Sequence, residues 1–282
     1  LVKRFSCHEL HSYIWTYNDE YKELGIEVED NIKLLNATNP NIETIRKSII
    51  PTQLCQVKTN TGYSTDFGVF EIARVVNGLN AEGLCDERKK LAITLFSKTK
   101  SVEALYFELA NMLSVVADDV KHKAISFKTV EATHSYEHPV NLNEIYCDGK
   151  LLGKIGVVHP VVSKKIDKKA AIVFVEIDVN DFADIANASI HYEEPSRFPE
   201  MEIDLTFVSD TFAPINDAIA SVNSPLVKKV SVADIYEDEN GKAITVRILF
   251  SHPERTLTGE EVKVVTDAVL KELEGKNIFM KN

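Results

Sequence analysis

Hydrophobic and polar residues follow a regular pattern over the last third of the chain. Between residues 203 and 208 they alternate, which predicts a strand with one buried face. Apolar residues then recur at helical spacing after Pro214, a residue suited to the first turn of a helix. A second extended run covers residues 227–236. The Asn240-Gly241 pair that follows is typical of a tight hairpin, because both residues tolerate positive φ.

The same part continues with a third strand and a second helix. Residues 244–250 alternate again. Thr258 and Glu261 have the spacing of a capping box, so a helix is predicted to begin there, and Gly275 is expected to end it in a left-handed conformation. Residues 278–280 are predicted as a last short strand. The order β-α-β-β-α-β predicts a ferredoxin-like domain.

The earlier part of the chain predicts several strands with helices between them. In order they are a strand over 9–15, a helix from Pro51, strands over 67–75 and 90–96, an amphipathic helix over 102–116, a hairpin of 144–147 and 151–158 around Asp148-Gly149, a short helix after Pro160, and a strand over 172–179. Residues 189–196 carry no apolar period. Two domains are therefore expected, over residues 1–190 and 195–282.

Three short motifs in the last domain resemble one known module. They are Arg197-Phe198-Pro199 before Asp204-Leu205, the run Val232–Tyr236, and Arg255–Thr258 before the second helix. They are similar to the ferredoxin-like anticodon-binding domain that closes the β chain of bacterial phenylalanyl-tRNA synthetases. The chain departs from that family at Glu202-Ile203, where basic residues are usual. It also departs at Glu237–Glu239, where a longer Gly-containing insert is usual.

Motifs in the first domain resemble the same β chain. They are Asn39-Pro40, Arg46-Lys47-Ser48, Ile49-Ile50-Pro51, Phe70-Glu71-Ile72, and Gly156 followed by His159-Pro160. The resemblance implies an antiparallel-sheet module similar to the class II synthetase core that has lost its chemistry. The predicted fold is thus α+β, with a non-catalytic class II synthetase-like module followed by a ferredoxin-like βαββαβ domain.

The resemblance also implies partners and a cellular setting. The family is a cytoplasmic heterotetramer of two α and two β chains, in which the α chain would bind ATP, Mg²⁺ and phenylalanine. This part of the β chain would pack on the α chain and contact the anticodon stem of the tRNA. We expect no cofactor in this part itself. Because the first residue is Leu1, we expect the chain to be a piece of a longer one.

Composition limits the classes of function. The 44% hydrophobic and 27% charged content is that of a soluble globular protein, and no apolar run approaches a membrane span, so no membrane partner is expected. The net charge is −11. From Pro195 onward ten Lys and Arg face fifteen Asp and Glu, which leaves −5 there and −6 before it. This balance argues against a general nucleic-acid binder, and no DNA partner is expected. The four cysteines are widely spaced and predict reduced, buried thiols.

The sequence lacks the phosphate-binding residues of a class II active site. Such a site needs arginines that clamp ATP phosphates, one of them on a Gly-rich segment. Arg74 could match the first of these arginines by position only, and Gly153–Gly156 falls in a predicted strand, where glycine more often permits close packing. His8 and His11 have no adjacent third ligand for a metal. No catalytic or metal-binding residue is predicted, and the chain alone is expected to be inactive.

Five basic residues of the last domain are the candidate contacts with tRNA phosphates. They lie near the predicted sheet and its edges, and are Arg197, Lys228, Lys229, Arg247 and Arg255. The alternative is that they balance nearby carboxylates such as Glu200, Glu202 and Asp204.

Two other functions remain open from the sequence. One is a synthetase-like paralogue that has lost its tRNA function. The other is a free-standing class II-like amide ligase, although the chain has only seven arginines with which to clamp phosphates. If the α chain is its partner, the first module should expose an apolar patch or associate with itself in the absence of that partner.

Overall fold

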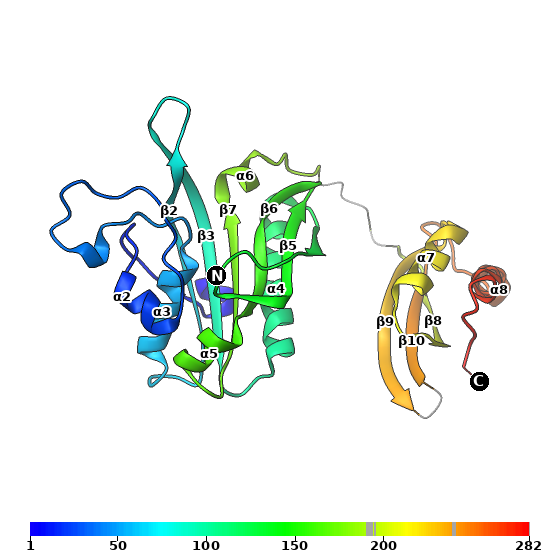
Figure 1. Cartoon of the computed structure of the whole chain (residues 1–282). Coiled ribbons are helices and arrows are strands. Elements are labelled where there is room, and N and C mark those ends of the chain that lie inside the picture. The colour runs from blue at the N-terminus through cyan, green and yellow to red at the C-terminus, as the bar shows by residue number, and fades with distance from the viewer. Residues whose placement is uncertain (190–193, 195, 239–240, 282) are drawn as a thin grey trace. The chain divides into compact units, whose positions relative to one another are not determined.

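The structure is a computed structural model that describes residues 1–189, 194, 196–238 and 241–281. The chain divides into two compact units, residues 1–190 and 191–282, shown in Figure 1. We refer to them as unit 1 and unit 2. None of the described helices is both long and apolar enough to cross a membrane.

Unit 1 is built on one seven-stranded sheet in the order β1-β2-β3-β7-β6-β5-β4. Neighbouring strands are antiparallel except for β1 and β2, which are parallel. Its elements are α1 (Val2–Phe5), β1 (His8–Glu9), α2 (Asn18–Leu24), η1 (Pro40–Ile42), α3 (Ile50–Asn60), β2 (Asp66–Leu79), β3 (Cys85–Ser97), α4 (Val102–Lys121), β4 (Ile125–Thr129), β5 (Glu137–Cys147), β6 (Lys150–Val158), α5 (Pro160–Ile166), β7 (Ala171–Asp178) and α6 (Val179–Asp184).

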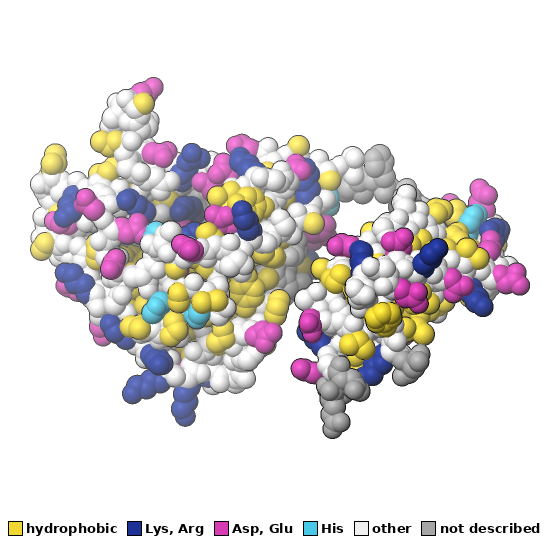
Figure 2. All heavy atoms as spheres, turned by 45° about the vertical axis from the view of Figure 1, so that its right-hand side comes forward, with side chains coloured by type: hydrophobic (Ala, Val, Ile, Leu, Met, Phe, Trp, Pro, Cys, Tyr) yellow, Lys and Arg dark blue, Asp and Glu magenta, His cyan; other side chains and the backbone are white. Residues whose placement is uncertain are grey.

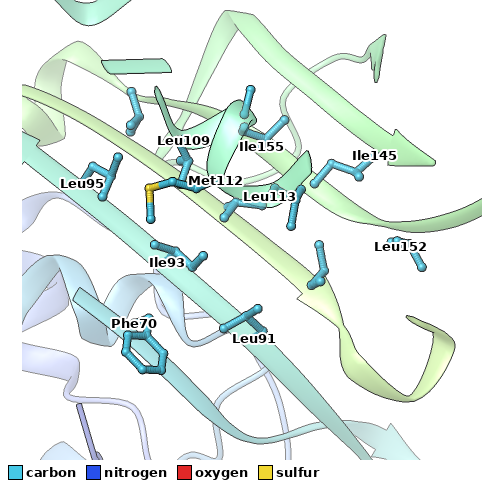
Figure 3. Close-up of a cluster of buried hydrophobic side chains, with 14 of the residues drawn as sticks. Phe70, Leu91, Ile93, Leu95, Leu109, Met112, Leu113, Ile145, Leu152 and Ile155 are labelled. Atoms are coloured by element: carbon cyan, nitrogen blue, oxygen red, sulfur yellow. The ribbon is translucent and has the colours of Figure 1, made fainter. Parts of the chain in front are cut away.

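Helix α4 covers one face of this sheet because its apolar stripe matches the side chains that the strands present. Figure 3 shows Leu109, Met112 and Leu113 of α4 over Leu91 and Ile93 of β3. The Ser101 hydroxyl accepts the Ala104 N–H at 3.1 Å and caps the start of the helix. The strands thus bury one set of alternate residues under α4.

The opposite face of the sheet packs on α2, α3 and α5. Phe96 of β3 and Phe174 of β7 are fully buried there with Leu54 of α3. A polar contact joins the same two layers, since Thr94 Oγ1 donates to Gln53 Oε1 at 2.7 Å. The central strands therefore bury both of their faces.

Arg46 and Glu71 form an ion pair inside unit 1, and both are 2% exposed. Arg46 Nη2 lies 3.2 Å from Glu71 Oε1, and Nη1 donates to Ser12 Oγ at 2.6 Å. The Ser12 hydroxyl and backbone N–H in turn donate to the Glu71 carboxylate at 2.7 and 3.0 Å. The network attaches the irregular N-terminal segment to β2, because Ser12 has its partners on two other segments.

Unit 2 is a three-stranded antiparallel sheet in the order β8-β10-β9 with two helices. A bridge between Phe207 and Met280 adds the C-terminal residues beside β8. The four buried residues Ile244, Val246, Ile248 and Phe250 belong to one core with the helices. The capping box at Thr258 and Glu261 is present. The elements are β8 (Met201–Val208), α7 (Ala213–Val222), β9 (Val227–Asp238), β10 (Gly241–Phe250) and α8 (Gly259–Gly275).

Four expectations from the sequence are wrong. Residues 9–15 are not one strand: β1 ends at Glu9, and Trp15 makes only an isolated bridge to Ile45. Gly275 is the last residue of α8, and the left-handed residue beyond it is Asn277 (φ 58°). Residues 278–280 make a single bridge rather than a strand. Cys85 is exposed, unlike the other three cysteines. The predicted Asn240 turn residue lies outside the described residues.

Replacing Arg46 with alanine is expected to destabilise unit 1 by about 3–5 kcal/mol, because Glu71 would remain buried without its counter-charge. The measurement is urea unfolding followed by the fluorescence of Trp15, the one tryptophan, which lies in unit 1. Arg74→Ala is the control, since its exposed pair with Glu87 (3.0 Å) should contribute only about 0–1 kcal/mol. Equal losses in the two variants would contradict the prediction.

The Glu29–His134 pair predicts a pH dependence of unfolding. The hydrogen bond to Glu29 raises the pKa of His134 above 6.5, and the same bond lowers the pKa of Glu29 below 4.5. The histidine contribution is fully present below pH 6.5 and is lost as the pH rises through the raised pKa. The glutamate contribution is present above pH 4.5 and is lost in acid.

The stability difference between wild type and His134→Gln should therefore be largest between pH 4.5 and 6.5 and shrink toward alkaline pH. Trp15 fluorescence during urea unfolding at a series of pH values measures it. Loss of the stacking of His134 on Tyr136 does not vary with pH in this way, so a flat difference would show that the ion pair contributes nothing.

Candidate functional site

A groove of about 230 Å³ lies over strands β6 and β7 of unit 1 and contains several charged residues. Glu176 accepts hydrogen bonds from the Ile49 N–H at 2.7 Å and from Lys90 Nζ at 2.9 Å. Glu137 accepts from the Thr133 N–H at 2.6 Å, and Lys154 Nζ lies 3.0 Å away. Each of the two carboxylates has a lysine and backbone partners within the protein. The charged groups of the groove therefore have their hydrogen-bond partners within the protein. They attach the loops that contain Ile49 and Thr133 to the sheet.

The glycines of strand β6 are needed for close packing. A β-carbon at Gly153 would lie 2.0 Å from the backbone oxygen of Glu176, and one at Gly156 would lie 2.7 Å from Leu142. Both glycines pair with β7, at Ile177 and Phe174 respectively. The prediction that this segment packs closely is confirmed.

Arg74, which was matched to a phosphate clamp by position, lies on the surface. Its side chain is 70% exposed and its Nη1 is 3.0 Å from Glu87 Oε2. No arginine lines the groove over β6 and β7, among the residues that the structure describes. In the described part of the chain, no group of three His, Cys, Asp or Glu side chains is arranged to hold a metal ion.

The open face of the unit 2 sheet brings together part of the predicted RNA site. The strand register places Arg247 opposite Asp204 on β8 and Ser231 on β9, and places Leu249 opposite Lys229. Residues directly opposite each other share a face. Arg247 and Lys229 therefore lie on the side of the sheet that faces away from the two helices.

Arg247 is held by a carboxylate on the same face. Its Nε and Nη2 donate to the two oxygens of Asp204, each at 2.8 Å, and its Nη1 lies 3.6 Å from Glu202. The bidentate contact raises the pKa of Arg247 and lowers the pKa of Asp204. This pairing is the one expected if the cation balances nearby carboxylates.

The other predicted arginines are also paired, but not with the expected partners. Arg197 Nη2 lies 2.9 Å from Glu194, and Arg255 Nη1 donates to Glu261 at 2.8 Å. The hydrogen bonds from Arg255 lower the pKa of Glu261 to about 2. Arg197 precedes β8 and Arg255 precedes α8, so neither lies on a strand of the sheet.

Lys228 and Lys229 lie on β9, the edge strand of the three-stranded sheet. Both are exposed. Lys229 pairs with Leu249, and a register shift separates it from the next pair, Val227 with Phe250. Lys228 is the extra residue at this bulge. The bulge bends the edge strand locally at the position of the two lysines.

An aromatic and cationic group that was not predicted from the sequence lies at the other end of the open face. Tyr236, paired with Ala243, is 41% exposed, and Lys281 Nζ lies 4.7 Å from the centre of its ring. Phe279 is 58% exposed nearby on the C-terminal segment that bonds to β8. Alternation around Ile278 would have indicated the exposure of Phe279, but no local pattern joins Lys281 to Tyr236.

The comparisons with known proteins agree with the two units. Residues 1–179 match a family model described as "Phenylalanyl tRNA synthetase beta chain CLM domain". Residues 196–279 match the "Ferredoxin-fold anticodon binding domain".

Individual proteins similar to this chain are named phenylalanine–tRNA ligase beta subunits. A phenylalanine–tRNA ligase beta subunit of Geobacillus kaustophilus is 27% identical over 277 residues, which cover 93% of this chain and 34% of that protein. One of Bacillus subtilis is 27% identical over 289 residues, covering 92% and 34%. One of Bacillus licheniformis is 34% identical over 146 residues, covering 49% and 18%. The chain spans about a third of the length of the first two of these relatives. Because the first family model covers more than half of its 282 residues, the chain belongs to the phenylalanyl-tRNA synthetase β-chain family.

Proposed function

We propose that the chain is a non-catalytic scaffold and tRNA-binding part of a phenylalanine–tRNA ligase β subunit. With an α subunit, such an enzyme would attach phenylalanine to its tRNA at the cost of ATP. One observation carries the proposal: a unit that matches an anticodon-binding domain has a sheet face that its helices leave open. That face presents Lys229, Tyr236 and Lys281. Aromatic rings and cations on an open sheet suit single-stranded RNA, whose bases stack and whose phosphates need counter-charge.

Unit 1 is proposed to be a catalytic-like relative of the class II synthetase core. A helix, α3, leads into the long antiparallel pair β2 and β3, and the last strand β7 is followed directly by α6. Where an active core would clamp ATP, this unit has a surface Arg74 paired with Glu87 and a β6 packed against β7. The proposal therefore assigns ATP and Mg²⁺ to the α chain.

Unit 1 also has a groove with exposed apolar residues, and these support a protein partner. The groove has a volume of about 480 Å³, lies between α4 and β5, and is lined by Tyr106, Phe107 and Val140 together with polar residues such as Glu103 and Asn143. Phe107 is 62% exposed and Val140 is 69% exposed. Contiguous apolar surface of this kind marks interaction sites. We propose that an α chain covers such a surface in a cytoplasmic heterotetramer of two α and two β chains.

A paralogue without tRNA function is the second candidate, and the pairing of Arg247 with Asp204 favours it. The three arginines nominated for phosphate contact each have a carboxylate partner. RNA would have to compete with these carboxylates. The test uses the two lysines of β9, because they lie exposed on the edge strand of the sheet.

The chain alone is expected to catalyse no phenylalanine-dependent pyrophosphate exchange, because it presents no arginine clamp for ATP. The measurement compares the purified chain with a protein-free blank and with a complete phenylalanine–tRNA ligase. Exchange above the blank, in a preparation free of host ligase, would contradict the proposal and favour a free-standing ligase.

The tRNA contact is tested by changing Lys228 and Lys229 to alanine in the chain assembled with an α subunit. If the lysines neutralise phosphates, the slope of log affinity against log salt should fall by about one for each phosphate that is no longer neutralised. Affinity should fall evenly across tRNAs, since backbone contacts carry no sequence information.

The control removes two exposed lysines from the helix layer, Lys263→Ala with Lys271→Ala on α8. This variant should keep the wild-type slope. An unchanged slope in the β9 variant would mean that these lysines do not contact RNA, and the paralogue would then be the better account.

A further inference from the structure

Helix α5 and the turn after it carry four exposed lysines within six residues. Lys164 and Lys165 lie in the last turn of α5, and Lys168 and Lys169 follow it before β7 begins. We call these four residues the lysine patch. Figure 2 shows Lys and Arg side chains gathered at the lower end of unit 1, the end where Figure 1 labels α5.

The one carboxylate in this stretch, Asp167, contacts the backbone of Lys169 and the side chain of Lys98, and among the described residues it pairs with no ammonium group of the lysine patch. Asp167 Oδ1 accepts the backbone N–H of Lys169 at 2.9 Å, and Oδ2 lies 3.1 Å from Lys98 Nζ on the turn after β3. The hydrogen bond from the Lys169 backbone and the contact with Lys98 lower the pKa of Asp167, so it stays charged and bound to them. Within the ranges that the structure describes, no ion pair joins any ammonium group of the lysine patch to a carboxylate.

Neighbouring segments add positive charge to the patch. The pairing of Ser97 with Ala171 places the turn that carries Lys98 beside the turn that carries Lys168 and Lys169. These five lysines, Lys98 included, together with Asp167 carry a formal charge of +4 in a chain of −11. The patch also extends toward α2, since Lys165 Nζ lies 2.7 Å from the position that a β-carbon of Gly25 would take.

Folding alone does not explain this concentration of charge. A lysine in the last turn of a helix interacts favourably with the helix dipole, which accounts for Lys164 and Lys165. Lys168 and Lys169 lie beyond the end of α5 and gain nothing from it. Four like charges without carboxylate partners repel each other, whereas phosphate groups would relieve that repulsion and release bound counterions.

We propose that the lysine patch is a second RNA-binding surface, located in unit 1, which contacts the sugar–phosphate backbone of a tRNA without reading its sequence. The patch presents flexible ammonium groups, which bind phosphate as point charges and recognise no base. The choice of tRNA as the RNA rests on the proposed function. The contact itself is separate from the open sheet of unit 2, because its residues belong to another unit.

The test replaces Lys164, Lys165 and Lys168 with alanine in the full chain. Binding of a fluorescently labelled tRNA is followed by anisotropy at several salt concentrations. The slope of log affinity against log salt should fall by about two to three, near 0.9 for each phosphate that the variant no longer binds, and affinity at low salt should fall with it. The matched control removes three exposed lysines of α8 and the residue after it, Lys263, Lys271 and Lys276, and should leave the slope unchanged.

The arginine variant Lys164→Arg, Lys165→Arg, Lys168→Arg keeps the charge and should keep the wild-type slope, which separates a charge effect from misfolding. A patch variant with the wild-type slope would overturn the inference. If only the β9 lysine variant lowers the slope, the proposed function stands and the inference fails. If only the patch variant lowers it, the inference stands and the unit 2 contact fails. Patch-dependent binding to phosphatidylserine vesicles, with tRNA binding unaffected, would also overturn it.

Discussion

The seven-stranded sheet of unit 1 has to bury both faces of its central strands, and most of the unit follows from that requirement. Alternate residues of β3 go to α4 on one side and to α3 on the other. Polar groups that enter this interior need partners there, since an unpaired buried polar group costs about 1–3 kcal/mol. Thr94 is bonded to Gln53, and Arg46 is bonded to Glu71 and Ser12. Tight packing of β6 leaves no room for a side chain at residue 153, against β7, or at residue 156, against Leu142 of β5. The packing of both faces makes the central strands of unit 1 a buried framework.

In unit 2 only one face of the sheet is buried, and the other face remains exposed. Its two helices cover only one face of the sheet, so alternate residues of β10 are buried and Arg247 on the same strand is exposed. The middle of the open face has no surplus of positive charge, because two carboxylates, Asp204 and Glu202, lie beside Arg247. Any affinity of this face for RNA must therefore come from residues away from its middle. Lys229 lies near one end of the edge strand β9, and Tyr236 with Lys281 lies near the other end.

Local patterns in the sequence predicted the elements that depend on local rules. The β-α-β-β-α order of unit 2, the Thr258–Glu261 capping box and the Asp148-Gly149 hairpin all rest on residues within one turn or one strand of each other. The failures concern tertiary partners. Apolar and polar residues alternate weakly over residues 9–15, but the strand ends at Glu9. Ser12 instead forms hydrogen bonds with Glu71, which is 59 residues away in the sequence. The run of lysines around Asp167 is visible in the sequence, but whether carboxylates elsewhere neutralise it is decided by the fold. In the same way, the sequence nominated Asp204 as a partner for basic residues, but it did not anticipate Glu194 or Glu261.

An acidic chain binds a polyanion only if its positive charges are grouped apart from its negative ones. Whether such a group can bind phosphate depends on how far the remaining negative charges lie from it. At physiological ionic strength, charges more than about 8 Å apart in solvent are largely screened from each other. A phosphate near Lys168 therefore responds to the nearest ammonium groups and to Asp167, which Lys98 already neutralises. The net charge of −11 is the sum over the whole surface and is felt mainly during long-range approach. It would slow the approach of an RNA and would leave the proposed local contact nearly unaffected. The overall composition argues against a general nucleic-acid binder, and it is compatible with the local contact that we propose for the lysine patch.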